Sequence, residues 1–275
     1  MKAGFIGTGN MGSILVEAFL TAETFNPSDI TVSNRTEEKA NRLAKAFPGL
    51  KIAQQNQELV ENVDIIFICV KPHQFKDLFS EINSFIKPEQ ILISITSPIQ
   101  IKDLESWVSC KIAKVIPSIT NQVLAGNTLY TLNDAFSTQE RTQFIEMLES
   151  ISQPIEIEEN QARICSDLSS CGPAFLAKII EQMITVASEK REVSKDVATQ
   201  ITTQMLYGLS ELLLLGDYDL ETVQQCVAVP GGVTEEGLNM LEDELMPIFE
   251  KLFDKTHEKH ESDLIQLKDF QSQKA

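Results

Sequence analysis

The sequence lacks any apolar run long enough to cross a bilayer. Its apolar stretches, such as residues 65–70, are far shorter than the roughly 20 residues that a membrane-spanning helix needs. The chain begins with a short polar and apolar mixture that leads into a strand pattern, and not into the apolar segment of a signal peptide. We therefore expect a cytoplasmic protein that does not enter a membrane.

Basic residues are scarce. Lys and Arg together number 23 against 40 Asp and Glu, which gives a formal charge of −17 at pH 7. Because like charges repel, this charge argues against binding to a nucleic-acid backbone or to anionic lipid. We expect neither nucleic acid nor membrane as a partner, and any phosphate must be held locally by a few groups.

Metal-ligand clusters and disulfide patterns are missing as well. The five cysteines form no CxxC pair and lie scattered through apolar contexts: Cys69, Cys110, Cys165, Cys171 and Cys226. Such scatter is typical of buried, reduced thiols. His257 and His260 fall in a charged stretch, where we expect solvated side chains. The sequence predicts no metal site.

The first 150 residues do contain a regular alternation of strand and helix patterns. Apolar runs predict strands at residues 2–7, 30–33, 65–70, 91–95, 111–116 and 127–131, and helical spacing predicts helices between them. Strands separated by helices form a parallel sheet covered on both faces. The fold class predicted is α/β, with an N-terminal Rossmann-type domain whose ligand lies beyond the carboxyl ends of the strands.

A second, all-α domain is expected to follow. Strand patterns stop after Ser152, and helical patterns occupy residues 175–189, 195–215, 220–227 and 235–257. We expect the two domains to span 1–155 and 156–275. The segment 205–215 is apolar on more than one face, which predicts a buried subunit interface and hence a homodimer or larger homo-oligomer.

A GxGxxG motif stands between the first strand and the first helix, formed by Gly7, Thr8, Gly9, Asn10, Met11 and Gly12. Gly7 suits the tight turn, Gly9 lets the main chain approach a pyrophosphate, and Gly12 lets the helix pack on the strand. The helix start adds unpaired N–H groups and the positive end of its dipole. The motif in this position predicts a dinucleotide cofactor.

The end of the second strand favours NADP(H) over NAD(H). An NAD-binding domain usually places an acid there, against the ribose 2′-hydroxyl. This chain has Ser33, Asn34 and Arg35 instead, which suit a 2′-phosphate that a carboxylate would repel. The alternative is that Arg35 is a solvated loop residue and Thr36 only caps the next helix.

Several motifs, in this order and spacing, resemble the pyrroline-5-carboxylate reductase family over nearly the whole chain. They are the glycine loop, Ser33-Asn34-Arg35, Asn56, Val70-Lys71-Pro72, Cys171-Gly172-Pro173-Ala174-Phe175 and Pro230-Gly231-Gly232-Val233-Thr234. The resemblance implies NADPH as cofactor, with Asn56 at the adenosine ribose and Val70, Lys71 and Pro72 beside the nicotinamide. As an alternative, Lys71 is a surface residue at a strand end and Asn56 a turn residue.

The loop before the last long helix is the candidate substrate site. Gly231, Gly232, Val233 and Thr234 offer successive N–H groups to a small carboxylate. The resemblance implies a cyclic imino acid as substrate, with Cys171 nearby and Thr234 placed at the ring nitrogen as the catalytic contact. The alternative is a plain turn in which Thr234 caps the helix.

Departures from the family pattern gather in the half that should meet the substrate. Val229 stands where a serine is usual, Val233 where a threonine or alanine is usual, and Cys171 where a serine is usual. In the first domain, Ser118-Ile119-Thr120 also replaces Asn-Thr-Pro. These departures resemble a divergent branch encoded with late competence genes in Gram-positive bacteria, the ComER-like proteins. Two interpretations stay open: an active reductase that makes proline from 1-pyrroline-5-carboxylate, and a weakly active or non-catalytic NADP-binding paralogue with a regulatory role. A β-hydroxy acid reductase using Lys178 is a third, less favoured by the Gly-Pro-Ala-Phe around that residue.

Overall fold

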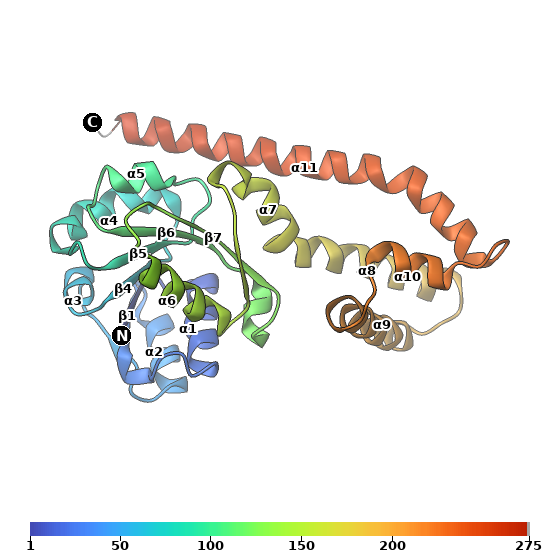
Figure 1. Cartoon of the computed structure of the whole chain (residues 1–275), viewed down its shortest axis with the longest axis horizontal. Coiled ribbons are helices and arrows are strands. Elements are labelled where there is room, and N and C mark those ends of the chain that lie inside the picture. The colour runs from blue at the N-terminus through green and yellow to red at the C-terminus, as the bar shows by residue number, and fades with distance from the viewer. Residues whose placement is uncertain (274–275) are drawn as a thin grey trace. The chain divides into compact units, whose positions relative to one another are not determined.

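The computed structural model describes residues 1–273, with side-chain detail through residue 265. An eight-stranded sheet in the order β3-β2-β1-β4-β5-β6-β7-β8 forms the centre of the N-terminal half (Figure 1). Its strands are β1 (Ala3–Ile6), β2 (Ile30–Ser33), β3 (Lys51–Ile52), β4 (Ile65–Ile68), β5 (Ile91–Ser94), β6 (Lys111–Ile116), β7 (Asn127–Leu132) and β8 (Gln153–Glu156). The sheet confirms the expected Rossmann-type fold class.

The sheet is parallel from β3 to β6, but β7 runs antiparallel to β6 and β8 is parallel to β7. The expectation that residues 127–131 join a fully parallel sheet is therefore wrong. The β6–β7 connection holds only a short 3-10 helix, Ile119–Val123, and so the chain turns back without the long crossover that a parallel neighbour requires. Strand β8 was not predicted, since its sequence QPIE is polar, carries Pro154 and lies at the sheet edge.

Helices cover both faces of the sheet, as the apolar strand runs predict. Side chains of α1, α2 and α6 share one buried cluster with the sheet, and those of α3, α4 and α5 share a second. These helices are α1 (Asn10–Thr21), α2 (Glu37–Ala46), α3 (Asn56–Glu61), α4 (Phe75–Ile82), α5 (Ile101–Glu105) and α6 (Thr138–Glu149). Strand β4 supplies Ile65 and Phe67 to the first cluster and Ile66 and Ile68 to the second. A strand buried on both faces has no polar side to alternate with, which explains its continuous apolar sequence.

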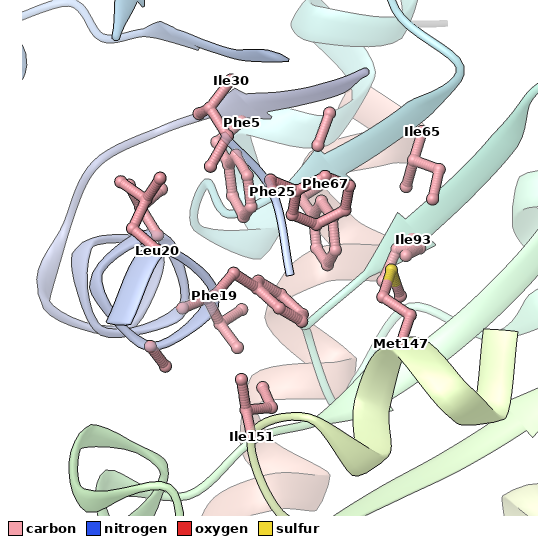
Figure 2. Close-up of a cluster of buried hydrophobic side chains, with 14 of the residues drawn as sticks. Phe5, Phe19, Leu20, Phe25, Ile30, Ile65, Phe67, Ile93, Met147 and Ile151 are labelled. Atoms are coloured by element: carbon pink, nitrogen blue, oxygen red, sulfur yellow. The ribbon is translucent and has the colours of Figure 1, made fainter. Parts of the chain in front are cut away.

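Aromatic rings fill the first cluster where β1, β4 and α1 meet (Figure 2). The rings of Phe5 and Phe67 stack with centroids 4.3 Å apart, and Phe19 of α1 packs against both. All three side chains are fully buried. These rings fix the position of α1 against the strand that precedes it.

The chain divides into two compact units, residues 1–173 with 257–275, and residues 174–256. The remaining helices are α7 (Ala162–Ser169), α8 (Gly172–Lys190), α9 (Lys195–Leu215), α10 (Leu220–Val227) and α11 (Val233–Gln273). The last of these extends well beyond the expected end at residue 257. The expected domain boundary after residue 155 stays a prediction, because compact packing does not test which segment folds alone.

The second unit leaves much apolar surface exposed. On α9, Leu214 and Leu215 are 79% and 78% exposed, although the helix sequence there is almost purely apolar. This exposure is what a buried subunit interface would cover. Within residues 1–273, no helix combines the length and the apolar composition that a bilayer crossing requires.

Removing the central ring should destabilise the first unit. We expect Phe67→Ala to lower the free energy of unfolding by about 3–5 kcal/mol, because it deletes a fully buried ring and leaves a cavity. Urea unfolding followed by the fluorescence of Trp107, the single tryptophan, measures this in the same unit. Val123→Ala at a site 74% exposed is the control. Equal midpoints for the two variants would contradict this account of the core.

Candidate functional site

A cleft of about 650 Å³ opens at the carboxyl ends of β1, β2 and β4, where a Rossmann fold places its ligand. Eight of the expected cofactor residues line it: Gly7, Gly9, Ser33, Asn34, Arg35, Asn56, Val70 and Lys71. The other five, Thr8, Asn10, Met11, Gly12 and Pro72, are not part of its lining. All thirteen belong to the first compact unit. Their contact with a cofactor stays a prediction.

The glycine loop has the geometry that a dinucleotide needs. Gly7 has φ +99°, which disfavours any side chain. A Cβ at Gly12 would lie 2.2 Å from the Gly7 carbonyl oxygen, so only glycine allows α1 to start this close to β1. At Gly9 a Cβ would meet nothing within 4 Å, and this residue lines the cleft. The main chain at Gly9 is therefore open to a pyrophosphate.

Two further observations fit a bound dinucleotide. The Thr8 hydroxyl is buried, and among the described residues it has no hydrogen-bond partner. Helix α1 begins at Asn10, so its first N–H groups have no acceptor within the helix. A diphosphate supplies acceptors of the kind these donors lack. The residues present fit the group that the motif implies.

Asn34 fastens the glycine loop to the end of β2. Its Oδ1 accepts the Thr8 N–H at 3.0 Å, and its Nδ2 donates to the Thr36 carbonyl at 2.7 Å. The Gly7 N–H donates to the Ser33 carbonyl at 2.8 Å. The side chain of Asn34 thus fixes the position of the glycine loop relative to residues 34–36, which are expected to bind the 2′-phosphate.

Two cations lie at the end of β2. Arg35 and Lys39 both line the cleft together with Thr36, and no acid is among the lining residues from β2 or α2. Sequence reasoning found Arg35 and missed Lys39, whose signal was its place in the first turn of α2. Thr36 occupies the N-cap position of that helix, but its side chain makes no capping bond. Its hydroxyl is available to a phosphate.

Asn56 is held between β2 and α4. Its Oδ1 accepts the Ser33 hydroxyl at 2.7 Å, and its Nδ2 donates to the Glu81 carboxylate at 3.2 Å. Glu81 lines the cleft but was not predicted, because nothing in the helix pattern of residues 75–82 marks it out. Asn56 is therefore no free turn residue, and Glu81 fixes which way its amide points.

The end of β4 forms another wall of the cleft. Val70 and Lys71 line it, and the Lys71 N–H donates to Gln74 Oε1 at 3.1 Å, which shapes the turn. Burial raises the pKa of the Cys69 thiol far above its usual range. This cysteine therefore stays neutral and adds no negative charge beside the glycine loop.

The candidate substrate loop belongs to the second unit and is a type II turn. The Gly232 N–H donates to the Val229 carbonyl at 2.8 Å, with Pro230 and then Gly231 at φ +73° between them. The Gly231 N–H donates to Glu235 Oε2 at 2.7 Å. Both glycine N–H groups thus have acceptors within this chain, and the expectation that the loop receives a substrate carboxylate stays a prediction. Val233 and Thr234 begin α11, and Val233 is 92% exposed.

Cys171 belongs to the first unit, whereas the candidate substrate loop belongs to the second. Its sulfur accepts a contact from Arg163 Nη2 at 3.4 Å, and Arg163 also pairs with the buried Asp167. Cys171, Cys69 and Cys165 are half-buried residues, and Cys226 is exposed. Among the five cysteines, only Cys110 is a buried residue, as was expected for all of them.

The two C-terminal histidines differ from the expectation of full solvation. His257 and His260 are both half-buried, and the pKa of His260 is lowered by burial and by the nearby charges of Arg163 and Lys114. The described residues hold no group of three His, Cys, Asp or Glu side chains that could bind a metal ion. Lys178 is exposed and pairs with Glu181 at 2.7 Å.

The sheet, the glycine loop and the cations at the end of β2 together define a Rossmann-type NADP oxidoreductase. Residues 2–98 match a family model described as NADP oxidoreductase coenzyme F420-dependent, and residues 159–263 match one described as pyrroline-5-carboxylate reductase dimerisation. The match to an NADP oxidoreductase model confirms the expected cofactor, NADP(H).

Similar proteins cover the whole chain. ComE operon protein 4 of Bacillus subtilis is 40% identical over 98% of both chains, and pyrroline-5-carboxylate reductase 3 of the same organism is 26% identical over 94% of this chain and 96% of its own. Pyrroline-5-carboxylate reductase structures from Streptococcus pyogenes and, with NADP bound, from Plasmodium falciparum share the fold, with TM-scores of 0.83 and 0.81 at 24% identity; they cover 95% and 98% of this chain and 98% of their own. The chain belongs to the pyrroline-5-carboxylate reductase family, on the branch that includes ComE operon protein 4.

The cations of the cleft should discriminate between cofactors. We expect Arg35→Ala and Lys39→Ala each to weaken NADPH binding about tenfold and to leave NADH binding nearly unchanged, because only NADPH carries the 2′-phosphate. Calorimetric titration of each variant with both nucleotides measures this. Arg42→Ala is the control, since Arg42 lies on α2 with Lys39, pairs with Glu17 and does not line the cleft. Equal losses for NADPH and NADH would contradict the assignment.

Glu81 should act on the cofactor through Asn56. We expect Glu81→Ala to weaken NADPH binding about fivefold, because the Asn56 amide loses an acceptor that fixes its direction. Glu81→Gln keeps an oxygen for the same bond and should bind at least as tightly as the unchanged protein. Thermal unfolding midpoints should agree among all three. A shift in the midpoint of Glu81→Ala that matches its loss of affinity would point to a structural role only.

Proposed function

We propose that this chain is an NADPH-dependent reductase of the C=N bond in a small cyclic imine, with conversion of 1-pyrroline-5-carboxylate to proline as the reference reaction. One observation supports this most: a cleft built for NADP(H) stands in the same chain as a helical half that matches the dimerisation model of this family. The first gives the hydride source, and the second favours an imine as acceptor.

The chemistry asks little of the protein itself. Reduction of the C=N bond takes one hydride, which the cofactor supplies, and one proton on the nitrogen, and it yields an amine and NADP⁺. A protonated imine already accepts hydride well, so the chain need only orient the ring and exclude water. In this proposal the Thr234 hydroxyl contacts the ring nitrogen, and no histidine acts as general base.

The exposed apolar surface of α9 supports a homodimer or larger homo-oligomer formed through the helical half. The matched dimerisation model favours the same arrangement. Cytoplasmic location is part of the proposal, because five free cysteines and an NADPH-consuming reaction suit a reducing compartment. A role in proline biosynthesis would follow from the reference reaction.

A second candidate is a weakly active or non-catalytic paralogue that uses its NADP-bound state for regulation. The relative at 40% identity is named ComE operon protein 4, whereas pyrroline-5-carboxylate reductase 3 of the same organism is 26% identical. The candidate substrate loop also favours this second candidate, because Val229 and Val233 offer no hydroxyl group to a substrate. Both candidates require NADPH binding, and only the first requires turnover.

Turnover decides between the two. We expect the full-length protein to oxidise NADPH only when a cyclic imine is present, as followed by absorbance at 340 nm. Thr234→Val should lower kcat at least about tenfold while NADPH affinity stays the same, since the hydroxyl contacts the imine and not the cofactor. Thr222→Val on α10 is the matched control, because it removes the hydroxyl of another half-buried threonine in the same unit. Folded protein that binds NADPH but oxidises none with any cyclic imine would exclude the reductase and leave the regulatory candidate.

A further inference from the structure

The end of β5 and the segment after it carry three hydroxyl side chains, of which two already have a partner. Ser94 Oγ and Thr96 Oγ1 lie 3.0 Å apart and share a hydrogen bond. The Ser97 hydroxyl is also buried, yet it has no hydrogen-bond partner in the part of the chain that the structure describes. Because a buried hydroxyl without a partner has given up its bonds to water for nothing in return, such a group indicates that a further molecule supplies the missing partner.

Ser97 follows the strand next to the wall of the cofactor cleft. Strands β4 and β5 are parallel neighbours, so the residues after both leave the sheet at the same edge. The Ile95 N–H donates to the Ile68 carbonyl at 3.4 Å, which keeps the two segments adjacent at that edge. After Ile68 come Val70 and Lys71, which line the cleft, whereas Ser97 does not line it. Ser97 is therefore placed for a ligand that extends past β4.

The order of the strands gives the direction in which a dinucleotide would extend. The 2′-phosphate is expected at the end of β2, beside Arg35 and Lys39, and the diphosphate at the glycine loop after β1. The next strands in the same direction are β4 and then β5. The nicotinamide and its ribose, the far half of the molecule, therefore fall at the ends of these two strands. That half carries a carboxamide and ribose hydroxyls, all of which can pair with a serine hydroxyl.

We propose that Ser97 is a cofactor-binding residue, whose hydroxyl pairs with a polar group of the nicotinamide–ribose half of NADP(H). The pairing would satisfy the one hydroxyl of this segment that the described residues leave without a partner. It would also fix the nicotinamide half against the end of β5. The inference does not rest on the proposed imine reduction, because both candidate functions require NADPH binding.

The test compares two nucleotides that differ in this half. Calorimetric titration of the full-length protein uses NADPH and 2′,5′-ADP, which keeps the 2′-phosphate and lacks the nicotinamide and its ribose. We expect Ser97→Ala to weaken NADPH binding about tenfold, because one hydrogen bond to the ligand is lost. Binding of 2′,5′-ADP should change less than about twofold, since this ligand has no group that reaches the end of β5.

Two further serine variants are the controls. The Ser169 hydroxyl is likewise buried without a partner among the described residues, but the Ser169 carbonyl accepts the hydroxyl of Ser118, which follows β6, one strand further from β4. Ser169→Ala should therefore leave both affinities unchanged. Ser94→Ala removes a hydroxyl that is bonded to Thr96, so it should lower the thermal unfolding midpoint of the ligand-free protein. Ser97→Ala should not lower this midpoint, and NADPH should raise it less than in the unchanged protein.

The outcomes separate a cofactor contact from a structural role. Weaker NADPH binding in Ser97→Ala, with 2′,5′-ADP binding and the ligand-free midpoint unchanged, would support the assignment. Equal losses for NADPH and 2′,5′-ADP would overturn it, and so would a lowered ligand-free midpoint with unchanged affinities. The same loss of NADPH affinity in Ser169→Ala would overturn the placement at β5. Protein that shows the expected binding but reduces no imine would refute the proposed function and leave this inference standing.

Discussion

The approach of Gly12 to the Gly7 carbonyl is the contact on which the cofactor cleft depends. A single Cβ at position 12 would come within 2.2 Å of that oxygen, so α1 would have to move away from β1. The first N–H groups of α1 would then leave the place where a diphosphate meets them. The stacked rings of Phe5 and Phe67, with Phe19 packed on them, hold the helix in this position from below. The packing of the core therefore sets the position of the N–H groups that a diphosphate would meet at the surface.

Charge is distributed in accordance with that arrangement. In a molecule of net charge −17, three cations, Arg35, Lys39 and Lys71, line one cleft, together with the acids Asp77 and Glu81 of α4. The second unit has the opposite character, with a long acidic segment around the type II turn. An acidic surface keeps polyanions away, while local amides and cations still hold a nucleotide.

The family pattern and this chain's own contacts bear on different questions. Membership in the pyrroline-5-carboxylate reductase family follows from agreement over the whole chain, and it accounts for the sheet, the glycine loop and the helical half. The hydrogen bond from the Gly231 N–H to the Glu235 carboxylate is instead a contact seen within this chain. A shared fold therefore leaves room for a different substrate, because specificity depends on a few donors and charges at one loop.

The sequence by itself determined the elements whose local pattern is strong. Buried strands such as Ile65–Ile68 and the GxGxxG turn follow from residue type and spacing, which act over a few neighbouring residues. Only the tertiary structure decided the reversed direction of β7, the edge strand β8, and the places of Lys39 and Glu81 in the cleft. It also decided that Glu235 occupies the Gly231 amide. Each of these depends on which groups meet across space, and no local periodicity encodes such a meeting.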